Sequence, residues 1–362
     1  MKLLFLTRRY PPSIGGIQTH CYKLFTRLCQ KYDTTLVALT RDSILHLVWF
    51  LPWVALRTWI ALLFRRVNVV YFSDGVVCCL APLLKPFCGQ AKFFVTIYGL
   101  EMTYENRLAC QLMKFGARSC ERIIVISENS HRLAVNWGIP KERMDIVYVG
   151  VEPTVPSDNH LDQLQQDFEI EHSIRFGHDR VLLNIGRQVK RKGMFAFLEN
   201  GFPLLAEDIR MVIAGAGPEM DRILQLKNKL DLNNRIIILE SPTDDIAAML
   251  RRNSDLFLMP NIPMSSDVEG YGITPLESMY AETPVIAFAV DALVESIREG
   301  GYLISTGDYR AFVDQVHEFF ALPRFRQIEQ GHKARKYVLR EYSWDESARQ
   351  YAEIFAGERK SN

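Results

Sequence analysis

A glycine-rich segment near residue 270 combines two carboxylates with the start of a helix. It contains Glu269, Gly270, Tyr271, Gly272, Ile273, Thr274 and, eight residues after the first carboxylate, Glu277. Backbone amides at a helix start can hold a phosphate, because their N–H groups are unpaired and the helix dipole is positive there. A carboxylate on either side could accept paired hydrogen bonds from neighbouring hydroxyl groups, such as those of a ribose or a hexose. The pattern therefore indicates a site for a phosphorylated sugar.

A basic loop lies upstream, directly after the apolar run 181–185. Between Gly186 and Gly193 it holds four cations within six residues, namely Arg187, Lys190, Arg191 and Lys192. Cations between a strand end and a helix start would suit a diphosphate, and a solvated basic turn is the alternative. The spacing is not that of a P-loop. Gly215 and Gly217 form a second loop, in which the backbone could approach a ligand closely.

A third glycine loop lies near the N-terminus. The pair Gly15-Gly16 follows the apolar run 3–7, and Gln18 lies in the helical pattern after it. Such a pair can present backbone amides to a ligand, although most Gly-Gly pairs are plain strand-to-helix turns. The dinucleotide fingerprint G-x-G-x-x-G is missing here, which argues against a dehydrogenase.

Short apolar runs alternate with helical patterns in both halves of the chain. The expected strands are 3–7, 35–40, 67–72, 93–97, 122–126, 145–149, 181–185, 209–214, 235–239, 256–259, 285–288 and 301–304. This alternation predicts an α/β fold of two Rossmann-like domains with parallel sheets. Residues 153–178 are polar and typical of a linker, so we expect domains at 1–165 and 166–342. Sites in such sheets lie at the carboxyl ends of the strands, so a cleft across which the two sheets face should hold the chemistry.

The composition is that of an ordinary globular protein. Of 362 residues, 48% are hydrophobic and 23% are charged, which excludes a disordered or collagenous chain. Residues 1–150 contain 19 Lys and Arg against 9 Asp and Glu, a balance of +10, and the remainder has a balance of −9. A basic half suggests an anionic surface or substrate as its partner, with an accident of composition as the alternative. No RNA-binding motif accompanies the basic excess, so no nucleic-acid partner is expected.

The cysteines and the N-terminus indicate a cytoplasmic protein. Seven cysteines lie in the first third of the chain, and no C-x-x-C occurs. An odd number without such a motif indicates neither a disulfide framework nor a zinc site. The run 1–7 is too short for a secretory signal and is typical of a buried first strand.

The range 44–64 is a largely apolar run of 21 residues. Trp49, Trp53 and Trp59, with Arg57 among them, suit a helix that lies in a membrane interface. Helices packed in the core and a membrane span are the alternatives. Pro52 and Arg57 interrupt the run, which argues against a span.

These motifs, in this order, resemble the family 4 retaining glycosyltransferases of the GT-B fold along nearly the whole chain. The matching pieces are 15–18, 99–101, 150–152, 186–193, 215–218, 269–277 and 281–285. The strings Gly-Gly-Ile-Gln and Arg-Lys-Gly-Met resemble the phosphatidylinositol mannosyltransferase branch. Tyr342-Ser343-Trp344 resembles the point at which these enzymes send a last helix, here 343–362, back onto the first domain.

The resemblance implies a role for each motif. Arg187 and Lys192 would neutralise the donor diphosphate and Glu269 would contact the donor sugar, which makes these three the implied catalytic residues. Glu277 would hold the ribose hydroxyls. The donor side as a whole would comprise Gly16, Gly186, Arg187, Lys192, Gly215, Gly217, Glu269, Gly270, Tyr271, Gly272, Ile273, Thr274 and Glu277, and the acceptor side Gly15, Gln18, Tyr98 and Glu101. The family commonly has His-Gly-x-Asp/Glu where this chain has Tyr98-Gly99-Leu100-Glu101, and a tyrosine cannot act as a base at neutral pH.

The implied function is retaining transfer of a hexose from a GDP- or UDP-sugar to a glycan or lipid-linked acceptor at an anionic membrane surface. Cations and helix amides would stabilise the leaving group, so no metal and no other cofactor is expected. The enzyme would be cytoplasmic and peripheral on the inner face of the membrane. The alternatives are a non-catalytic nucleotide-sugar-binding protein and an epimerase or phosphorylase of the same fold. The first would be expected to lose Arg187, Lys192 or Glu269, and no motif marks a pyridoxal-phosphate lysine for a phosphorylase.

Overall fold

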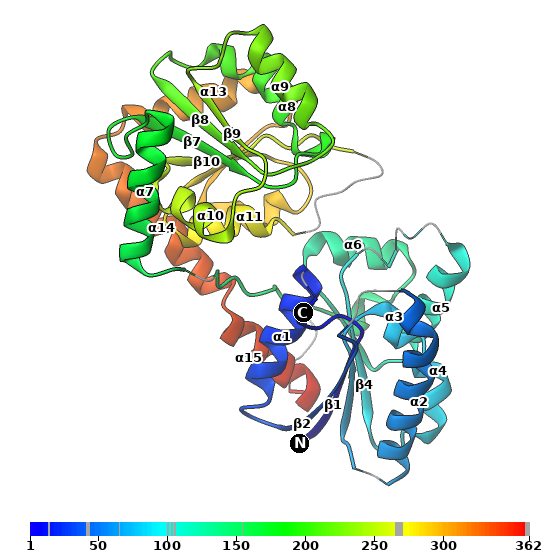
Figure 1. The fold of residues 1–362 in the computed structure, drawn as a ribbon. Helices are drawn as coiled ribbons and strands as arrows, with labels where there is room; N and C mark the ends of the chain where they lie inside the picture. The colour runs from blue at the N-terminus through cyan, green and yellow to red at the C-terminus, as the bar shows by residue number, and fades with distance from the viewer. Residues whose placement is uncertain are drawn as a thin grey trace. The chain divides into compact units, whose positions relative to one another are not determined.

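The computed structural model describes residues 1–13, 15–40, 44–64, 66–99, 101–102, 104, 106–153, 155–264 and 271–358. The chain forms two compact units, each built around its own sheet (Figure 1). The first unit comprises Met1–Gly150 with Tyr342–Asn362, and the second comprises Val151–Glu341. Two parallel sheets with surrounding helices confirm the predicted α/β class.

The first unit has a six-stranded parallel sheet in the order β2-β1-β3-β4-β5-β6. Its strands are β1 (Lys2–Thr7), β2 (Asp33–Ala38), β3 (Val69–Phe72), β4 (Lys92–Ile97), β5 (Arg122–Val125) and β6 (Met144–Ile146). All six overlap the ranges expected from the sequence. Four of them are almost continuously apolar, because helices cover both faces of the sheet.

The helices of the first unit divide between the two faces of its sheet. They are α1 (Gly16–Leu28), η1 (Ile44–His46), α2 (Leu47–Leu63), α3 (Gly75–Cys78), α4 (Ala81–Leu84), η2 (Lys85–Phe87), α5 (Arg107–Arg118), α6 (Glu128–Asn136), η3 (Lys141–Arg143) and α15 (Trp344–Ala356). Leu4 and Leu6 face a core shared with α2 to α6, whereas Leu3 and Phe5 face one shared with α1 and α15. Alternate residues of β1 therefore serve opposite cores, as the two-residue period of a strand requires.

The last helix of the chain, α15, packs beside α1 in the first unit (Figure 1). A Cβ on Gly150 would lie 2.5 Å from the Trp344 ring, so the absence of a side chain at 150 lets α15 begin there. Further along α15, Tyr351 and Thr96 are hydrogen bonded through their hydroxyl groups at 2.8 Å. These contacts tie the end of the chain to its first sheet.

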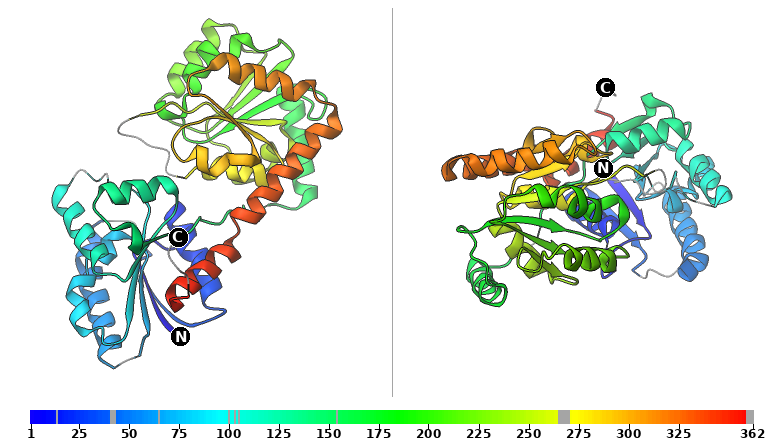
Figure 2. Two further views of the ribbon diagram at one scale, coloured as in Figure 1. Left: turned by 180° about the vertical axis from the view of Figure 1, so that it is seen from behind. Right: turned by 90° about the horizontal axis from the view of Figure 1, so that it is seen from above.

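The second unit repeats the architecture in the order β12-β11-β10-β7-β8-β9 (Figure 2). Its strands are β7 (Arg180–Ile185), β8 (Ile209–Ala214), β9 (Ile236–Leu239), β10 (Leu256–Met259), β11 (Val285–Phe288) and β12 (Tyr302–Ile304), again overlapping the expected ranges. Its helices are α7 (Asp158–His172), η4 (Lys190–Lys192), α8 (Met194–Asn200), η5 (Phe202–Leu204), α9 (Met220–Lys229), α10 (Asp244–Asn253), α11 (Ile273–Tyr280), α12 (Leu293–Ile297), η6 (Arg298–Gly300), α13 (Tyr309–Ala321) and α14 (Arg324–Glu341). Helices α8, α9 and α13 share one core cluster on one face, and α10 and α11 lie on the other (Figures 1 and 2).

The expectation that 153–178 is a linker is wrong for most of that range. Asp158–His172 forms the helix α7, which packs against α10 and belongs to the second unit. The second unit thus begins at Val151, earlier than the sequence-based boundary at 165. Only Leu161 and Phe168 of α7 are buried, so its apolar periodicity was too sparse to be recognised.

The apolar range 44–64 forms η1 and α2. Phe50, Val54, Thr58 and Leu62 make a single buried stripe along α2, while Trp49, Trp53 and Trp59 are exposed. Among the described residues, no helix combines the length and the hydropathy needed to cross a bilayer. The segment therefore covers the sheet with one face and presents tryptophans to the outside with the other.

Candidate active site

The second sheet has a switch point at which the chain reverses direction. From β7 the chain proceeds to β8 and β9 on one side and then returns to β10 on the other. In parallel sheets of this kind, ligands bind outside the carboxyl ends of the strands that flank such a point. The flanking loops here are the basic loop after β7 and the segment after β10.

Three loops at this edge are joined by backbone hydrogen bonds. The N–H of Gln188 donates to the carbonyl of Ala216 at 2.9 Å, and the N–H of Glu219 donates back to the carbonyl of Gln188 at 3.1 Å. The N–H of Ile262, after β10, donates to the carbonyl of Arg191 at 2.9 Å. The basic loop is therefore fixed from both sides.

The glycines of these loops bring backbones together. A Cβ on Gly217 would lie 2.1 Å from the carbonyl oxygen of Gln188, and one on Gly215 would lie 2.3 Å from that of Gly186. Gly193 has a φ of +68°, and its Cβ would lie 1.8 Å from the Pro260 carbonyl oxygen. The sequence suggested that glycines here let a ligand approach. The structure shows that at these positions they let neighbouring loops approach one another.

The four cations of the basic loop differ in exposure. Lys192 is buried, and its Cε lies 4.0 Å from the position that a Cβ on Gly186 would take. Arg187 and Lys190 are exposed, and Arg191 is half-buried. The loop therefore places one positive charge inside the edge of the unit and others at its surface.

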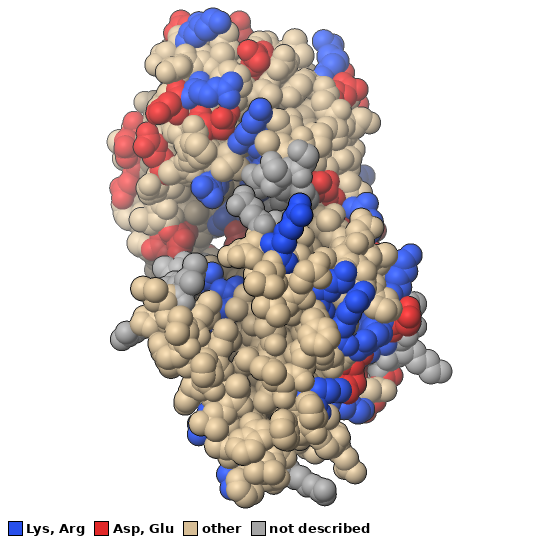
Figure 3. Space-filling model, turned by 90° about the vertical axis from the view of Figure 1, so that its right-hand side faces the viewer, with Lys and Arg blue, Asp and Glu red and all other residues tan. Residues whose placement is uncertain are grey.

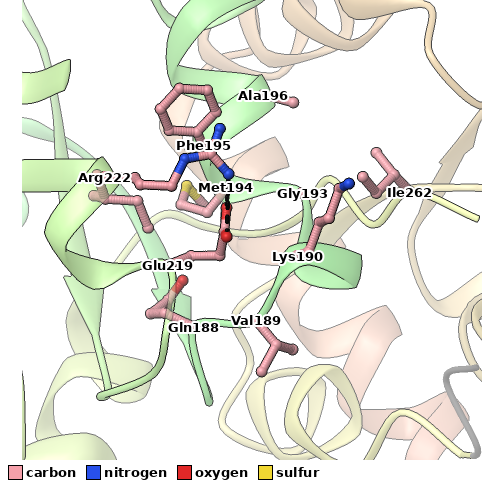
Figure 4. A pocket seen from close by; sticks show the side chains of 11 residues that line it. Gln188, Val189, Lys190, Gly193, Met194, Phe195, Ala196, Glu219, Arg222 and Ile262 are labelled. Carbon is pink, nitrogen blue, oxygen red and sulfur yellow. Dashed lines mark hydrogen bonds and ion pairs between the residues drawn. The ribbon is translucent and has the colours of Figure 1, made fainter. Parts of the chain in front are cut away.

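A small cavity opens beside this loop (Figure 4). In it Glu219 and Arg222 point toward each other, with Nη1 and Oε2 2.8 Å apart, and the guanidinium of Arg222 lies 4.1 Å from the centroid of the Phe195 ring. The cavity measures about 90 Å³, whereas ligand pockets measure roughly 300–1,000 Å³. It is too small for a sugar nucleotide.

The helix after β10 begins where the glycine-rich segment predicted a helix start. Gly272, with a φ of +75°, precedes Ile273, the first residue of α11. Tyr271 is buried, and Thr274 accepts a hydrogen bond from Ser278 through its carbonyl at 3.1 Å. Glu269 and Gly270 lie outside the described residues.

Glu277 lies one turn into α11, on the same face as Ile273. Its Oε2 accepts a hydrogen bond from Nη2 of Arg251, on α10, at 2.6 Å. The side chains are 26% and 12% exposed respectively. Burial raises the pKa of Glu277, and the charge of Arg251 acts in the opposite direction. Sequence reasoning missed Arg251, because nothing in its local pattern marks a partner 26 residues away.

In the first unit, Gly15 and Gln18 interact with each other. Gly15 precedes α1, and the side-chain oxygen of Gln18 lies 2.6 Å from the position that a Cβ on Gly15 would take. Gln18 is buried, so its side chain shapes the loop that Gly15 and Gly16 form rather than standing out from it.

Tyr98 and Glu101 lie after β4. The Glu101 carboxylate accepts hydrogen bonds from the N–H groups of Tyr98 and Gly99, both at 3.1 Å, and of Gly75 at 3.5 Å. Burial raises the pKa of Glu101, and these backbone hydrogen bonds oppose the change. The Tyr98 ring meets His20 edge-on at 5.4 Å, and burial raises the pKa of its hydroxyl well above the ordinary value. Through these hydrogen bonds Glu101 caps the loop that follows β4.

An ion pair that sequence reasoning missed lies after β1 and β3, at the corresponding switch point of the first sheet. Arg8 Nε lies 3.2 Å from Asp74 Oδ1. The same oxygen accepts hydrogen bonds from the N–H groups of Val76 at 2.8 Å and Val77 at 3.2 Å, at the start of α3. The signal available was the Asp-Gly pair directly after an apolar strand.

Comparison with known proteins identifies the family. The model of the family described as Glycosyl transferases group 1 matches residues 165–356, more than half of the chain. The chain belongs to this family. It is a glycosyltransferase, as the order of its motifs predicted, and its two Rossmann-like units are those of the GT-B fold.

Relatives of this glycosyltransferase extend the similarity over the whole chain. The N-acetyl-alpha-D-glucosaminyl L-malate synthase of Bacillus anthracis is 25% identical over 80% of this chain and 73% of that protein. The GDP-mannose-dependent alpha-(1-6)-phosphatidylinositol monomannoside mannosyltransferase of Mycolicibacterium smegmatis is 22% identical over 99% of each chain. The crystal structure of Anabaena HepE in complex with UDP has a TM-score of 0.74 at 15% identity, covering 99% of this chain and 100% of that one. This last likeness shows the fold.

Proposed function

We propose that this glycosyltransferase moves a hexose from a nucleotide-diphosphate sugar to a glycan or lipid-linked acceptor, with retention and without a metal ion. The observation that carries the proposal is the basic loop at the switch point of the second sheet. It is hydrogen bonded to the loops after β8 and β10 and contains the exposed Arg187 and the buried Lys192.

On the donor side, each group of residues is proposed to bind one part of the nucleotide sugar. Arg187 and Lys192 neutralise the diphosphate, the amides around Gly272 and Ile273 bind the distal phosphate, and Glu277 accepts hydrogen bonds from the ribose hydroxyls. Glu269 contacts the hexose hydroxyls from a position outside the described residues. The relatives support a nucleotide donor, because one is named as dependent on GDP-mannose and HepE was crystallised with UDP. A UDP- and a GDP-sugar are both within the proposal.

The chemistry is the breaking of one bond and the making of another at the anomeric carbon. The bond from that carbon to the diphosphate oxygen breaks and its electron pair leaves with the diphosphate, while the acceptor oxygen forms the new bond. Cations and helix amides stabilise the charge that grows on the leaving group, which is the task a metal ion performs elsewhere. Within the described ranges no three His, Cys, Asp or Glu side chains converge as a metal site, and Asp267 and Glu269 lie outside those ranges.

Retention is proposed to proceed by attack on the same face that the diphosphate leaves. A double displacement would need a carboxylate nucleophile next to the anomeric carbon. The two oxygens of Glu101, a carboxylate on the acceptor side, accept hydrogen bonds from three backbone N–H groups, so this residue is not proposed as the nucleophile. The acceptor proton would pass to an oxygen of the departing phosphate, so no protein base is required.

The acceptor side belongs to the first unit. Gly15 lies after β1 and precedes α1, Gln18 lies in the first turn of α1, and Tyr98 follows β4, so all three lie at the carboxyl edge of the first sheet. The basic balance of residues 1–150 supports an acceptor at an anionic membrane surface, with the enzyme on the cytoplasmic face.

The test is hydrolysis of a panel of nucleotide sugars, with and without excess EDTA, by the wild type and three variants. Lys192→Ala and Glu277→Ala should each reduce turnover of the accepted donor by two or more orders of magnitude, because contacts to a leaving diphosphate strengthen as charge develops. Lys229→Ala, at an exposed site at the end of α9, is the matched control and should retain wild-type turnover.

Two results would contradict the proposal. Near-normal turnover in Lys192→Ala or Glu277→Ala would remove that residue from the mechanism. Complete loss of activity in EDTA, restored by manganese or magnesium, would show that a metal ion stabilises the leaving diphosphate in place of Arg187 and Lys192. It would favour Asp267 and Glu269 as the metal ligands.

A further inference from the structure

The outer face of α5 is apolar although it is exposed. Leu108, Leu112 and Phe115 follow one another at intervals of four and three residues and are 70%, 50% and 61% exposed. The opposite face of the helix packs into the unit through Met113, Gly116 and Ala117. A surface helix normally places polar residues on its outer face, so this stripe calls for a partner.

Three neighbouring elements, α2, α4 and η2, carry further exposed apolar side chains. Helix α4 contacts both α5 and α2, and η2 contacts α2. The ring of Trp59 on α2 meets that of Phe87 on η2 edge-on at 6.1 Å. The exposed large apolar side chains of these elements are Val48, Trp49, Trp53, Leu56, Trp59 and Leu63 of α2, Leu83 of α4, Phe87 of η2, and Leu108, Leu112 and Phe115 of α5. We call this set the helical face.

The charged side chains within the helices of the helical face are all positive. The sequences of α2, α3, α4, η2 and α5 contain no Asp or Glu. They contain Arg57, whose guanidinium lies 5.6 Å from the Trp53 ring centroid, and Arg107, Lys114 and Arg118 on α5. They also contain Lys85 of η2, which forms an ion pair at 2.6 Å with Glu121 outside these helices. In the lower part of Figure 3, which belongs to the first unit, a wide surface without charged side chains is bordered mainly by Lys and Arg.

We infer that the helical face docks the first unit onto an anionic lipid bilayer. Exposed tryptophans and aliphatic side chains enter the interfacial layer, and arginine and lysine at the margin meet anionic headgroups. The inference deepens the proposed membrane acceptor and rests on that part of the proposed function. It adds that α5, and not only the apolar range 44–64, contacts the lipid.

The experiment measures binding of the full chain to vesicles. Vesicles of phosphatidylcholine with phosphatidylglycerol are compared with vesicles of phosphatidylcholine alone, at low and at high salt. The wild type should bind the anionic vesicles at least about ten-fold more tightly. Part of the binding should survive high salt, because salt does not screen buried apolar contacts.

Variants then test the role of α5. Combined Leu108→Ser, Leu112→Ser and Phe115→Ser should weaken binding to anionic vesicles by about ten-fold or more. The matched control replaces one phenylalanine and two aliphatic residues that are exposed on α14 of the second unit, Phe325, Ile328 and Leu339, by serine. This control should bind vesicles as the wild type does. All six positions are exposed, so both variants should fold.

Each other outcome overturns the inference. If the wild type binds neither kind of vesicle, no bilayer docks here. If the α5 variant binds as tightly as the control, α5 does not touch lipid. If the α5 variant instead abolishes a dimer seen by ultracentrifugation without vesicles, the helical face joins two copies of this chain. Nucleotide-sugar hydrolysis without vesicles should be the same in wild type, control and α5 variant, so failure of docking is distinguishable from failure of the proposed transfer.

Discussion

Replacing Arg251 should change the pH at which the enzyme begins to bind its nucleotide. Arg251 donates to Glu277 at 2.6 Å, and neither side chain is more than 26% exposed. If Glu277 accepts hydrogen bonds from a ribose, it must be ionised. Burial raises its pKa and Arg251 opposes that effect, so Arg251→Met should raise the pKa of Glu277 further and move the acid limit of nucleotide binding to higher pH.

The expected size follows from the geometry of the pair. Two unit charges about 4 Å apart attract by about 4 kcal/mol at an effective dielectric constant of about 20. The cost of desolvating two largely buried charges cancels much of this, which leaves about 1–2 kcal/mol for the pair. Glu277 affects the stability of the fold in the opposite direction to nucleotide binding: its contribution to stability is larger at low pH. A raised pKa favours the folded state fully below the ordinary glutamate pKa of about 4.3, and that contribution is lost as pH rises through the raised value.

The assay is calorimetric titration of UDP and of GDP at a series of pH values on the acid side of neutrality, where the terminal phosphate of the nucleotide also titrates. Because the phosphate contributes its own pH dependence, each shift is measured against Arg252→Met, the neighbouring arginine, which pairs with Asp158 and Asp162 of α7 instead. Arg251→Lys should restore part of the wild-type limit by returning the charge. If Arg251→Met shows the same acid limit as Arg252→Met and the wild type, Arg251 does not act on nucleotide binding through Glu277.

Two predictions concern stability. Gly193→Ala should lower the free energy of unfolding of the second unit by more than about 3 kcal/mol, because its Cβ would meet the Pro260 carbonyl. Gly177→Ala, at a similar φ but in open space, should lower it by only about 1 kcal/mol. Equal losses of the two variants in chemical denaturation would refute the close approach of Gly193 to Pro260. Burial lowers the pKa of His20 to about 3, so the stability it contributes above about pH 6.5 should be lost as pH falls toward 3. His20→Gln should flatten this decline in Tm, and an unchanged slope would count against a neutral buried imidazole.

Much of this protein could be predicted from its sequence. The alternation of apolar runs with helical patterns located the twelve strands of the described part of the chain, because parallel strands buried on both faces must be apolar along their length. The basic motif lies directly after such a run, so its place at the carboxyl edge of a sheet also followed. The order of the motifs along the chain identified the glycosyltransferase family, which the family model confirms.

The tertiary structure decided what depends on residues far apart in the chain. The helix α7 became evident only from its packing, because two buried residues in fifteen make no clear period. Arg251 donates a hydrogen bond to Glu277, and the Glu101 carboxylate accepts hydrogen bonds from three backbone N–H groups. These hydrogen bonds form only when the chain has folded and brought the residues together. The apolar run 44–64 left core packing and membrane docking open, because a sequence shows which residues are apolar but not which of them the fold covers. Burial depends on neighbouring residues, and only the folded chain shows that α2 and α5 each keep apolar side chains exposed.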